Sequence, residues 1–139
     1  ARSRAACTTS ELIRQSAELE QPIAIDPGRS RSERLFPPTL VVDPPRDSLL
    51  MREEIFGPIL PIVPYGRLED AIAYVNDRPR PLSLYYFGNV RGDQERVLAN
   101  IVAGGVTLND TVVHLTQDNL PFGGVGASGM GAYHGFDGF

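Results

Sequence analysis

Two segments of the chain space their apolar residues by three and four positions, which is the period of one helix face. These residues are Leu68, Ala71, Ile72 and Val75 in residues 67–76, and Val97, Leu98 and Ile101 in residues 93–101. Each segment therefore predicts a helix that turns these side chains inward. A third, short helix is predicted to start at Thr8, because Thr8 and Glu11 have the spacing of a capping box. Pro22 would end it.

Four short apolar runs have the length of strands rather than helices. They occupy residues 38–42, 59–63, 82–87 and 105–108. The run at 82–87 is almost continuously apolar, as in a strand covered on both faces. Pro61 has no N–H to donate to a neighbouring strand, so residues 59–63 are predicted to form an edge strand or to break there.

From residue 59 onward the predicted elements alternate as strand, helix, strand, helix, strand. This order is typical of an α/β fold with a mostly parallel sheet, right-handed crossovers and helices packed on the sheet. Beyond Asn109 the chain becomes irregular and carries 7 of its 14 glycines between Gly123 and Gly138. We therefore expect a long glycine-rich loop at the C-terminal end of the chain, with candidate chemistry at the carboxyl ends of the strands.

The composition narrows the class of protein. With 139 residues, 42% hydrophobic and 22% charged, the chain is predicted to form one globular domain at most. Its net charge of −4 argues against a nucleic-acid or anionic-membrane partner, since both require clustered positive charge. All 13 basic residues are arginine, which excludes a Schiff-base lysine and a P-loop lysine.

The composition also predicts a cytoplasmic location. A single cysteine cannot form an internal disulfide, which fits a reducing compartment. No apolar run approaches the roughly 20 residues that a membrane-spanning helix needs, so we expect no membrane segment in this chain. The first residues lack the apolar segment of a signal peptide and begin without methionine, from which we expect a cut piece of a longer protein.

A pair of carboxylates precedes an aromatic residue and a turn in the sequence Glu53-Glu54-Ile55-Phe56-Gly57-Pro58. Adjacent side chains point in different directions on a regular backbone, so one glutamate can face a ligand while the other stays in water. A carboxylate can accept hydrogen bonds from two ribose hydroxyls while the ring packs on a flat heterocycle. The alternative interpretation is a solvated pair at a turn, with Phe56 in the core.

Residues 124–129 match the spacing G-x-G-x-x-G, but we do not interpret them as a dinucleotide-binding fingerprint. That fingerprint needs an apolar strand before it, a helix after it, and an acidic residue about 20 positions later. Residues 120–123 are too short and proline-broken for such a strand, and the chain ends at Phe139, before the acid. The glycines instead predict a backbone with unusual φ values that can approach other groups closely.

Residues 51–59, Met-Arg-Glu-Glu-Ile-Phe-Gly-Pro-Ile, resemble a signature of the aldehyde dehydrogenase superfamily, as does Leu-Pro-Phe-Gly-Gly at residues 120–124. The resemblance implies that the complete enzyme uses NAD or NADP as its cofactor. It implies that Glu54 binds the hydroxyls of the nicotinamide ribose and that Phe56 packs against the nicotinamide side.

The resemblance is strong over residues 35–136 and loose over residues 8–34. We therefore divide the chain into an N-terminal helix and exposed connection, residues 1–34, and the C-terminal part of the family's catalytic domain, residues 35–139. Both ends of that domain are expected to be missing.

The glycine loop resembles one branch of the superfamily in particular. Gly-Ala-Ser-Gly-Met-Gly-Ala-Tyr-His-Gly at residues 126–135 is similar to the class 3 branch and, within it, to coniferyl aldehyde dehydrogenases. The resemblance implies that an aldehyde tunnel is lined by Leu115, Thr116, Phe122 and His134. Without the resemblance, His134 fits a loop histidine bound to backbone carbonyls equally well. His114 is predicted to be structural, and two histidines with one distant cysteine do not have the spacing of a metal site.

The family's chemistry needs a cysteine thiolate that attacks the aldehyde carbon. The single cysteine, Cys7, lies 47 positions before Glu54, and its neighbours do not resemble the family's nucleophile loop. We expect the nucleophile, the general base and the Rossmann half to be absent from this chain. We therefore expect no catalytic residue in it and no turnover by the isolated chain.

The resemblance implies part of an enzyme that oxidises an aromatic, coniferyl-type aldehyde, or another apolar aldehyde, to its carboxylic acid with NAD(P). The complete enzyme is expected to be a homodimer. The alternative is a stand-alone, non-catalytic module or truncated remnant that associates with itself or with a full-length subunit. A third interpretation, reduction of acyl phosphates, is disfavoured by the class 3-like glycine loop.

Overall fold

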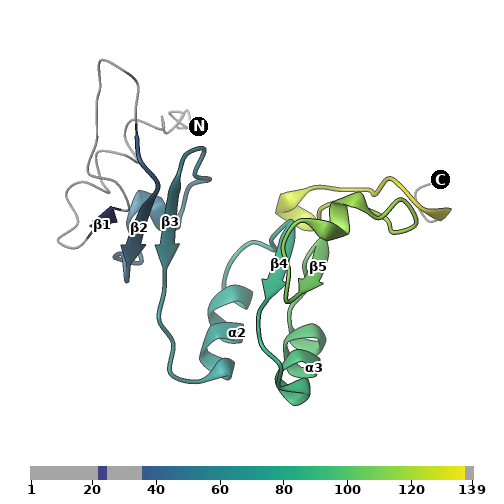
Figure 1. Cartoon of the computed structure of the whole chain (residues 1–139), viewed down its shortest axis with the longest axis horizontal. Coiled ribbons are helices and arrows are strands. Elements are labelled where there is room, and N and C mark those ends of the chain that lie inside the picture. Colours follow the sequence, from purple (N-terminus) through teal and green to yellow (C-terminus); the bar gives the residue numbers. More distant parts are fainter. Residues whose placement is uncertain (1–21, 25–35, 137–139) are drawn as a thin grey trace, which may run out of the picture. The chain divides into compact units, whose positions relative to one another are not determined.

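A computed structural model of the chain describes residues 22–24 and 36–136 (Figure 1). The polypeptide divides into two compact units, residues 1–64 and residues 65–139. The helix predicted from Thr8 and most of the predicted N-terminal connection lie outside the described residues. Among those described, no helix is both long and apolar enough to cross a membrane.

The first unit contains a three-stranded sheet in the order β1-β2-β3 (Figure 1). The strands are β1 (Pro22–Ala24), β2 (Thr39–Val42) and β3 (Ile59–Ile62), and the short 3-10 helix η1 (Leu49–Met51) lies between β2 and β3 in sequence. Strand β1 is antiparallel to β2, whereas β2 and β3 are parallel. Val41, Leu50 and Ile59 form the buried core of this unit.

The predicted edge position of the strand around Pro61 is confirmed, since β3 ends the described sheet. The amides of Thr39 and Asp43 donate to the carbonyls of Pro58 and Ile62. Alternate residues of β3 therefore bond to β2, and Pro61 falls on the outer edge. Its missing N–H removes a bond that a further strand would need there.

The second unit alternates helices and strands. It contains α2 (Leu68–Asn76), β4 (Ser83–Tyr86), α3 (Arg91–Asn100) and β5 (Gly105–Leu108), and β4 and β5 are paired in parallel. The α/β class with parallel pairing is confirmed. Within the first unit β3 pairs with β2, and within the second unit β4 pairs with β5 (Figure 1).

The helices pack on the sheet through one apolar cluster. Ile72 of α2 and Val97 and Ile101 of α3 are buried, and Leu84 and Tyr86 of β4 pack against them. The prediction that Leu98 also points inward is wrong, since this side chain is 45% exposed. Leu98 lies one residue, or about 100°, around the helix from Val97, which moves it off the face that Val97 and Ile101 share.

An exposed ion pair also joins the two helices. Arg96 Nη1 of α3 lies 2.6 Å from Glu69 Oε1 of α2. The pKa of Glu69 lies below its ordinary value, chiefly because a backbone amide at the start of α2 donates to its carboxylate, with Arg96 and Arg67 adding favourable charge. Both side chains of the pair are about half exposed, so we assign it little stability.

The contrast between Val97 and Leu98 gives a matched stability prediction. Val97→Ala is expected to lower the free energy of unfolding by about 2 kcal/mol, because it removes two buried methyl groups. Leu98→Ala is expected to cost less than about 1 kcal/mol, because that side chain already contacts water. Urea unfolding followed by circular dichroism measures both. Equal losses would contradict the packing described for α3.

Candidate functional site

Residues 52–58, which we call the carboxylate loop, connect η1 to β3. Backbone hydrogen bonds fix this loop at both ends. The Glu53 amide donates to the Leu49 carbonyl at 2.9 Å, and the Ile59 amide donates to the Gly57 carbonyl at 2.9 Å. Ile55 packs against the core of the first unit. The loop is therefore anchored to a packed sheet.

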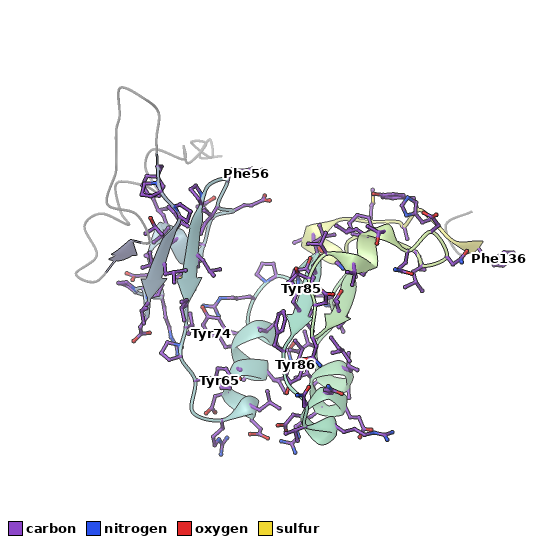
Figure 2. All side chains as sticks on the ribbon, viewed as in Figure 1. Phe56, Tyr65, Tyr74, Tyr85, Tyr86 and Phe136 are labelled. Atoms are coloured by element: carbon purple, nitrogen blue, oxygen red, sulfur yellow. The ribbon has the colours of Figure 1, made fainter. Side chains whose placement is uncertain are left out.

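The side chains on either side of Ile55 are exposed. Both glutamates of the pair lie in solvent, and Phe56 is 74% exposed. Figure 2 shows Phe56 at the tip of the loop that leads into β3. The alternative that places Phe56 in the core is contradicted, because Ile55 is the residue that packs there. A carboxylate and a ring remain accessible on one short loop, and this arrangement fits a ribose next to a flat heterocycle.

His114 lies on the face of β4 and β5 opposite to the helices. Ser83 Oγ is 3.2 Å from His114 Nε2, and Thr107 Oγ1 is 3.1 Å from His114 Nδ1. The ring of Tyr85 is 5.8 Å from the imidazole, centroid to centroid. The segment 82–87 is contacted on both faces but is not covered as predicted, since Leu82, Tyr85 and Phe87 are 41%, 37% and 64% exposed. The structural role predicted for His114 is supported, since both of its ring nitrogens are bonded.

The predicted tunnel residues Phe122 and His134 are joined through Tyr133. Phe122 and Tyr133 form an isolated antiparallel bridge, with backbone bonds of 2.7 and 2.9 Å, and their rings meet edge to face at 5.4 Å. The Tyr133 and His134 rings meet in the same way at 4.4 Å. The Phe122 ring lies 5.9 Å from His114. These rings form a continuous row, which we call the aromatic row: Tyr85, His114, Phe122, Tyr133 and His134.

The two other predicted tunnel residues lie on η2 (Val113–Thr116), directly after His114. The Leu115 amide donates to the Val112 carbonyl at 2.8 Å. The Thr116 hydroxyl donates to the Val113 carbonyl at 2.9 Å, so its oxygen lone pairs remain available to a ligand. All four residues predicted to line the tunnel therefore belong to the second unit, and Glu54 and Phe56 belong to the first.

The glycine-rich loop leaves β5 at its carboxyl end but runs back along the sheet to the opposite end. A Cβ on Gly104, just before β5, would lie 2.6 Å from the Leu82 carbonyl oxygen and would also collide with the Gly123 carbonyl. The loop therefore contacts the amino end of β5 as well as its carboxyl end. Gly104 and Gly105 leave the space in which the returning chain packs.

The G-x-G-x-x-G match is not a dinucleotide fingerprint, as predicted. Within residues 109–136, all of which are described, the match is preceded by the bridge residue Phe122 and contains one turn of 3-10 helix, η3 (Gly126–Ser128). It is followed by the bridge residue Tyr133 and not by an α-helix. Ser128 Oγ accepts from the Val125 amide at 2.9 Å and closes this turn locally. Gly126 and Gly129 adopt positive φ, as expected for a backbone that needs glycine.

Two residues of the loop without glycine's freedom also adopt left-handed backbone. Val112 has φ 67° and His134 has φ 69°. This conformation is unfavourable for a β-branched residue and persists only where surrounding contacts enforce it. The segment between these two positions carries three of the predicted tunnel residues, and His134 is the fourth. The segment is therefore held in a defined shape by its contacts with the sheet.

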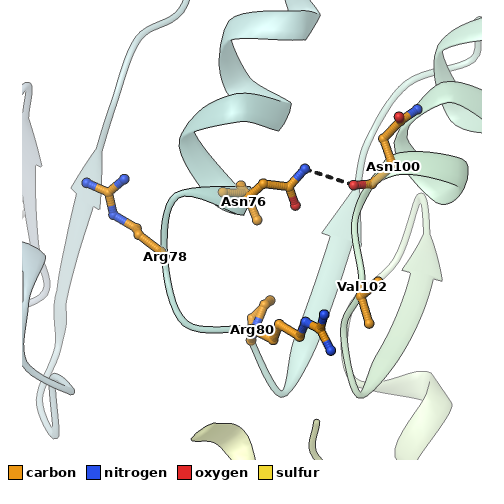
Figure 3. A pocket seen from close by; sticks show the side chains of 7 residues that line it. Asn76, Arg78, Arg80, Asn100 and Val102 are labelled. Carbon is orange, nitrogen blue, oxygen red and sulfur yellow. Dashed lines mark hydrogen bonds between the residues drawn. The ribbon is translucent and has the colours of Figure 1, made fainter. Parts of the chain in front are cut away.

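A cavity of about 330 Å³ lies elsewhere in the second unit (Figure 3). It is lined by Val75, Asn76, Arg78, Arg80, Pro81, Asn100 and Val102. Asn76 Nδ2 donates to the Asn100 carbonyl at 2.9 Å. The Arg78 guanidinium donates to the Tyr74 carbonyl at 2.9 Å and lies 3.4 Å over the Tyr74 ring. None of the six predicted binding residues lines this cavity, and its polar lining is unsuited to an apolar aldehyde.

Sequence reasoning missed several residues that shape the site. Ser83, Thr107 and Tyr133 hold His114 and the aromatic row, but they are far apart in sequence and give no spacing signal. Asn109 adopts φ 57°, and its Oδ1 accepts from the Gly88 amide at 2.8 Å, which joins the chain segments that follow β4 and β5. An asparagine directly after a strand was the available signal, because asparagine tolerates left-handed backbone.

The described residues contain no group of three or more potential metal ligands.

Comparison with known proteins gives one consistent result. The model of the aldehyde dehydrogenase family matches residues 2–139. A "probable coniferyl aldehyde dehydrogenase" of Pseudomonas aeruginosa is 60% identical over 107 residues, which cover 77% of this chain and 22% of that protein. Aldehyde dehydrogenase family 3 member A2 of Rattus norvegicus is 50% identical over 115 residues, which cover 83% of this chain and 24% of that protein.

The fold agrees with these matches. The substrate-bound state of Staphylococcus aureus AldH superimposes with a TM-score of 0.80 at 44% identity, and the match covers 95% of this chain and 30% of that one. The chain spans only 22–24% of the length of the two curated relatives. The resemblance to the class 3 branch and to coniferyl aldehyde dehydrogenases is confirmed. The chain belongs to the aldehyde dehydrogenase family.

Proposed function

We propose that this chain is part of an NAD(P)-dependent aldehyde dehydrogenase that oxidises an aromatic, coniferyl-type aldehyde, or another apolar aldehyde, to its carboxylic acid. The observation that carries the proposal is the aromatic row, in which Phe122 and His134 are joined through Tyr133. With Leu115 it offers an apolar wall, and Thr116 and His134 add a few polar atoms. Pockets for small apolar ligands have this composition.

Glu54 and Phe56 would hold the cofactor. The Glu54 carboxylate can accept from two vicinal ribose hydroxyls, and the exposed Phe56 ring can pack on a flat heterocycle. The cofactor held there would supply the hydride acceptor for the oxidation. The chain's own contribution is to fix the ribose and to exclude water beside the ring. The choice between NAD and NADP is not assigned to any residue of this chain.

On the aldehyde side, the role of the chain is to orient the substrate. Phe122 and Leu115 would contact the apolar body of the aldehyde, and Thr116 and His134 would orient its polar group. We assign no catalytic residue to the chain, because the neighbours of its single cysteine, Cys7, do not resemble the family's nucleophile loop. The complete enzyme is proposed to be a cytoplasmic homodimer. The second candidate is a stand-alone, non-catalytic module that associates with itself or with a full-length subunit. It is also consistent with a chain to which we assign no nucleophile.

A chimera tests the proposal directly. Residues 35–139 replace the matching segment of the Pseudomonas aeruginosa relative, and the unmodified relative is measured in parallel. We expect the chimera to keep kcat/KM for coniferyl aldehyde within about tenfold of the host's value and to prefer it to acetaldehyde, because apolar contacts discriminate by about 10–200-fold. The 139-residue chain alone is expected to give no cofactor-dependent rate. A folded chimera that prefers acetaldehyde would contradict the proposed substrate class.

A further inference from the structure

The position of His114 depends on a glycine in the strand beneath it. In the parallel pair, Ser83 lies opposite Gly105 and Tyr85 lies opposite Thr107. These four residues share one face of the two strands, because side chains alternate along a strand. A Cβ on Gly105 would lie 2.9 Å from His114 Nε2. The missing side chain of Gly105 therefore lets the imidazole approach the backbone of β5.

The hydrogen bonds of His114 fix the ring within this space. A neutral imidazole has one N–H donor and one acceptor nitrogen, and a hydroxyl can serve as either partner. Ser83 Oγ at 3.2 Å and Thr107 Oγ1 at 3.1 Å therefore satisfy both nitrogens at once. The two bonds come from different strands, so the ring bridges β4 and β5. Rotation of the imidazole out of this position would break both bonds.

The anchored ring is connected to the proposed tunnel wall in two ways. Leu115 and Thr116 follow His114 directly on η2. The Phe122 ring lies 5.9 Å from the imidazole and continues through Tyr133 to His134. Val112, just before η2, is held at φ 67°, a backbone state that needs enforcing contacts. His114 binds this segment to the sheet through its hydrogen bonds with Ser83 and Thr107.

We propose that His114 is a positioning residue for the aldehyde: by bridging Ser83 and Thr107 it fixes η2 and the aromatic row, and so sets the shape of the tunnel wall. The inference rests on the proposed function for its effect on the aldehyde. We call the two hydrogen bonds that hold the His114 ring between Ser83 and Thr107 the anchor. The anchor is a property of this chain and can be tested without turnover. His114 touches neither substrate nor cofactor in this role.

The kinetic test uses Thr107, which contacts His114 but is not one of the proposed binding residues. In the chimera, Thr107→Val removes the hydroxyl and keeps the shape of the side chain. We expect KM for coniferyl aldehyde to rise about tenfold, because Nδ1 of the half-buried His114 loses its hydrogen-bond partner and the wall shifts. KM for the cofactor and kcat with acetaldehyde should stay within about twofold. Thr107→Ser retains the hydroxyl and should restore KM to within about threefold of the unchanged chimera.

A purely structural role predicts a different result. Thr107→Val would then change the thermal midpoint and would affect both aldehydes and the cofactor alike. Such a uniform change, or a Thr107→Ser variant as impaired as Thr107→Val, would overturn the proposal. Ser83→Ala provides a second test on the other nitrogen, in case Thr107→Val does not fold. It should raise KM for coniferyl aldehyde in the same selective way.

Nitrogen NMR of the 139-residue chain separates the anchor from the proposed function. The sequence has two histidines, so His134→Gln assigns the His114 signals. We expect one fixed tautomer of His114 and a ring N–H that exchanges slowly with water, and both features should be lost in Thr107→Val. A rapidly exchanging, mixed tautomer in the unchanged chain would overturn the anchor. If the anchor is present but the chimera oxidises no aldehyde, the proposed function fails and the positioning of an aldehyde fails with it.

Discussion

Glu54→Gln in the chimeric enzyme is expected to raise KM for NAD⁺ by roughly 30- to 150-fold. The substitution keeps the size of the side chain but removes its charge and replaces one acceptor oxygen with a donor. Two charge-assisted hydrogen bonds to the ribose would be weakened or lost, which corresponds to about 2–3 kcal/mol. The measurement is the initial rate as a function of cofactor concentration at saturating aldehyde.

Glu53→Gln is the matched control for this experiment. The two glutamates are adjacent and both exposed, and only Glu54 is proposed to contact the ribose. The Glu53 amide donates to the Leu49 carbonyl, which is a backbone contact that the substitution leaves intact. We expect Glu53→Gln to change KM for the cofactor by less than about threefold. Similar effects of both substitutions would indicate a general charge effect and would contradict a specific ribose contact.

The helices and strands of the second unit could be predicted because their signals are local. Apolar residues three and four apart define one face of each helix. Ile72 of α2 is buried on such a face, and so are Val97 and Ile101 at the other helix, α3. The error at Leu98 has the same origin, since apolar character alone does not tell a residue on the face from its neighbour about 100° away. Which strands pair within each unit was not predictable, because the order of elements leaves the pairing open.

The candidate site could be predicted only in part. The class 3 resemblance of residues 126–135 pointed to His134, and the glycine pattern pointed to a closely approaching backbone. The links between these residues depend on distant contacts, such as Thr107 with His114 and Phe122 with Tyr133. A sequence does not encode such contacts as a spacing. The need for glycine at position 105 could not be predicted, because the sequence does not show that the His114 ring occupies the space above it.

Gly104→Ala is expected to destabilise the second unit by about 3 kcal/mol, the upper part of the range for overpacking. The new Cβ would lie 2.6 Å from the Leu82 carbonyl oxygen and would collide with that of Gly123. Both contacts are with backbone, so no flexible side chain can move aside. The Leu82 carbonyl also accepts from the Gly105 amide at 2.9 Å, one of the bonds that begins the pairing of β4 with β5. Urea unfolding of the 139-residue chain measures the loss.

Gly92→Ala separates this steric effect from the general consequence of replacing glycine. Gly92 lies in α3, where a Cβ would meet nothing within 4 Å. Alanine there should leave stability unchanged or raise it by up to about 1 kcal/mol, because it favours helix and restricts the unfolded chain. Gly104→Ala within about 0.5 kcal/mol of the unchanged chain would contradict the close packing of Gly123. If stability is retained but the chimera loses affinity for coniferyl aldehyde, then the loop at Gly123 has moved while the strand pairing has held. That outcome would place the adjustable element beside Phe122, in the wall that the proposed substrate contacts.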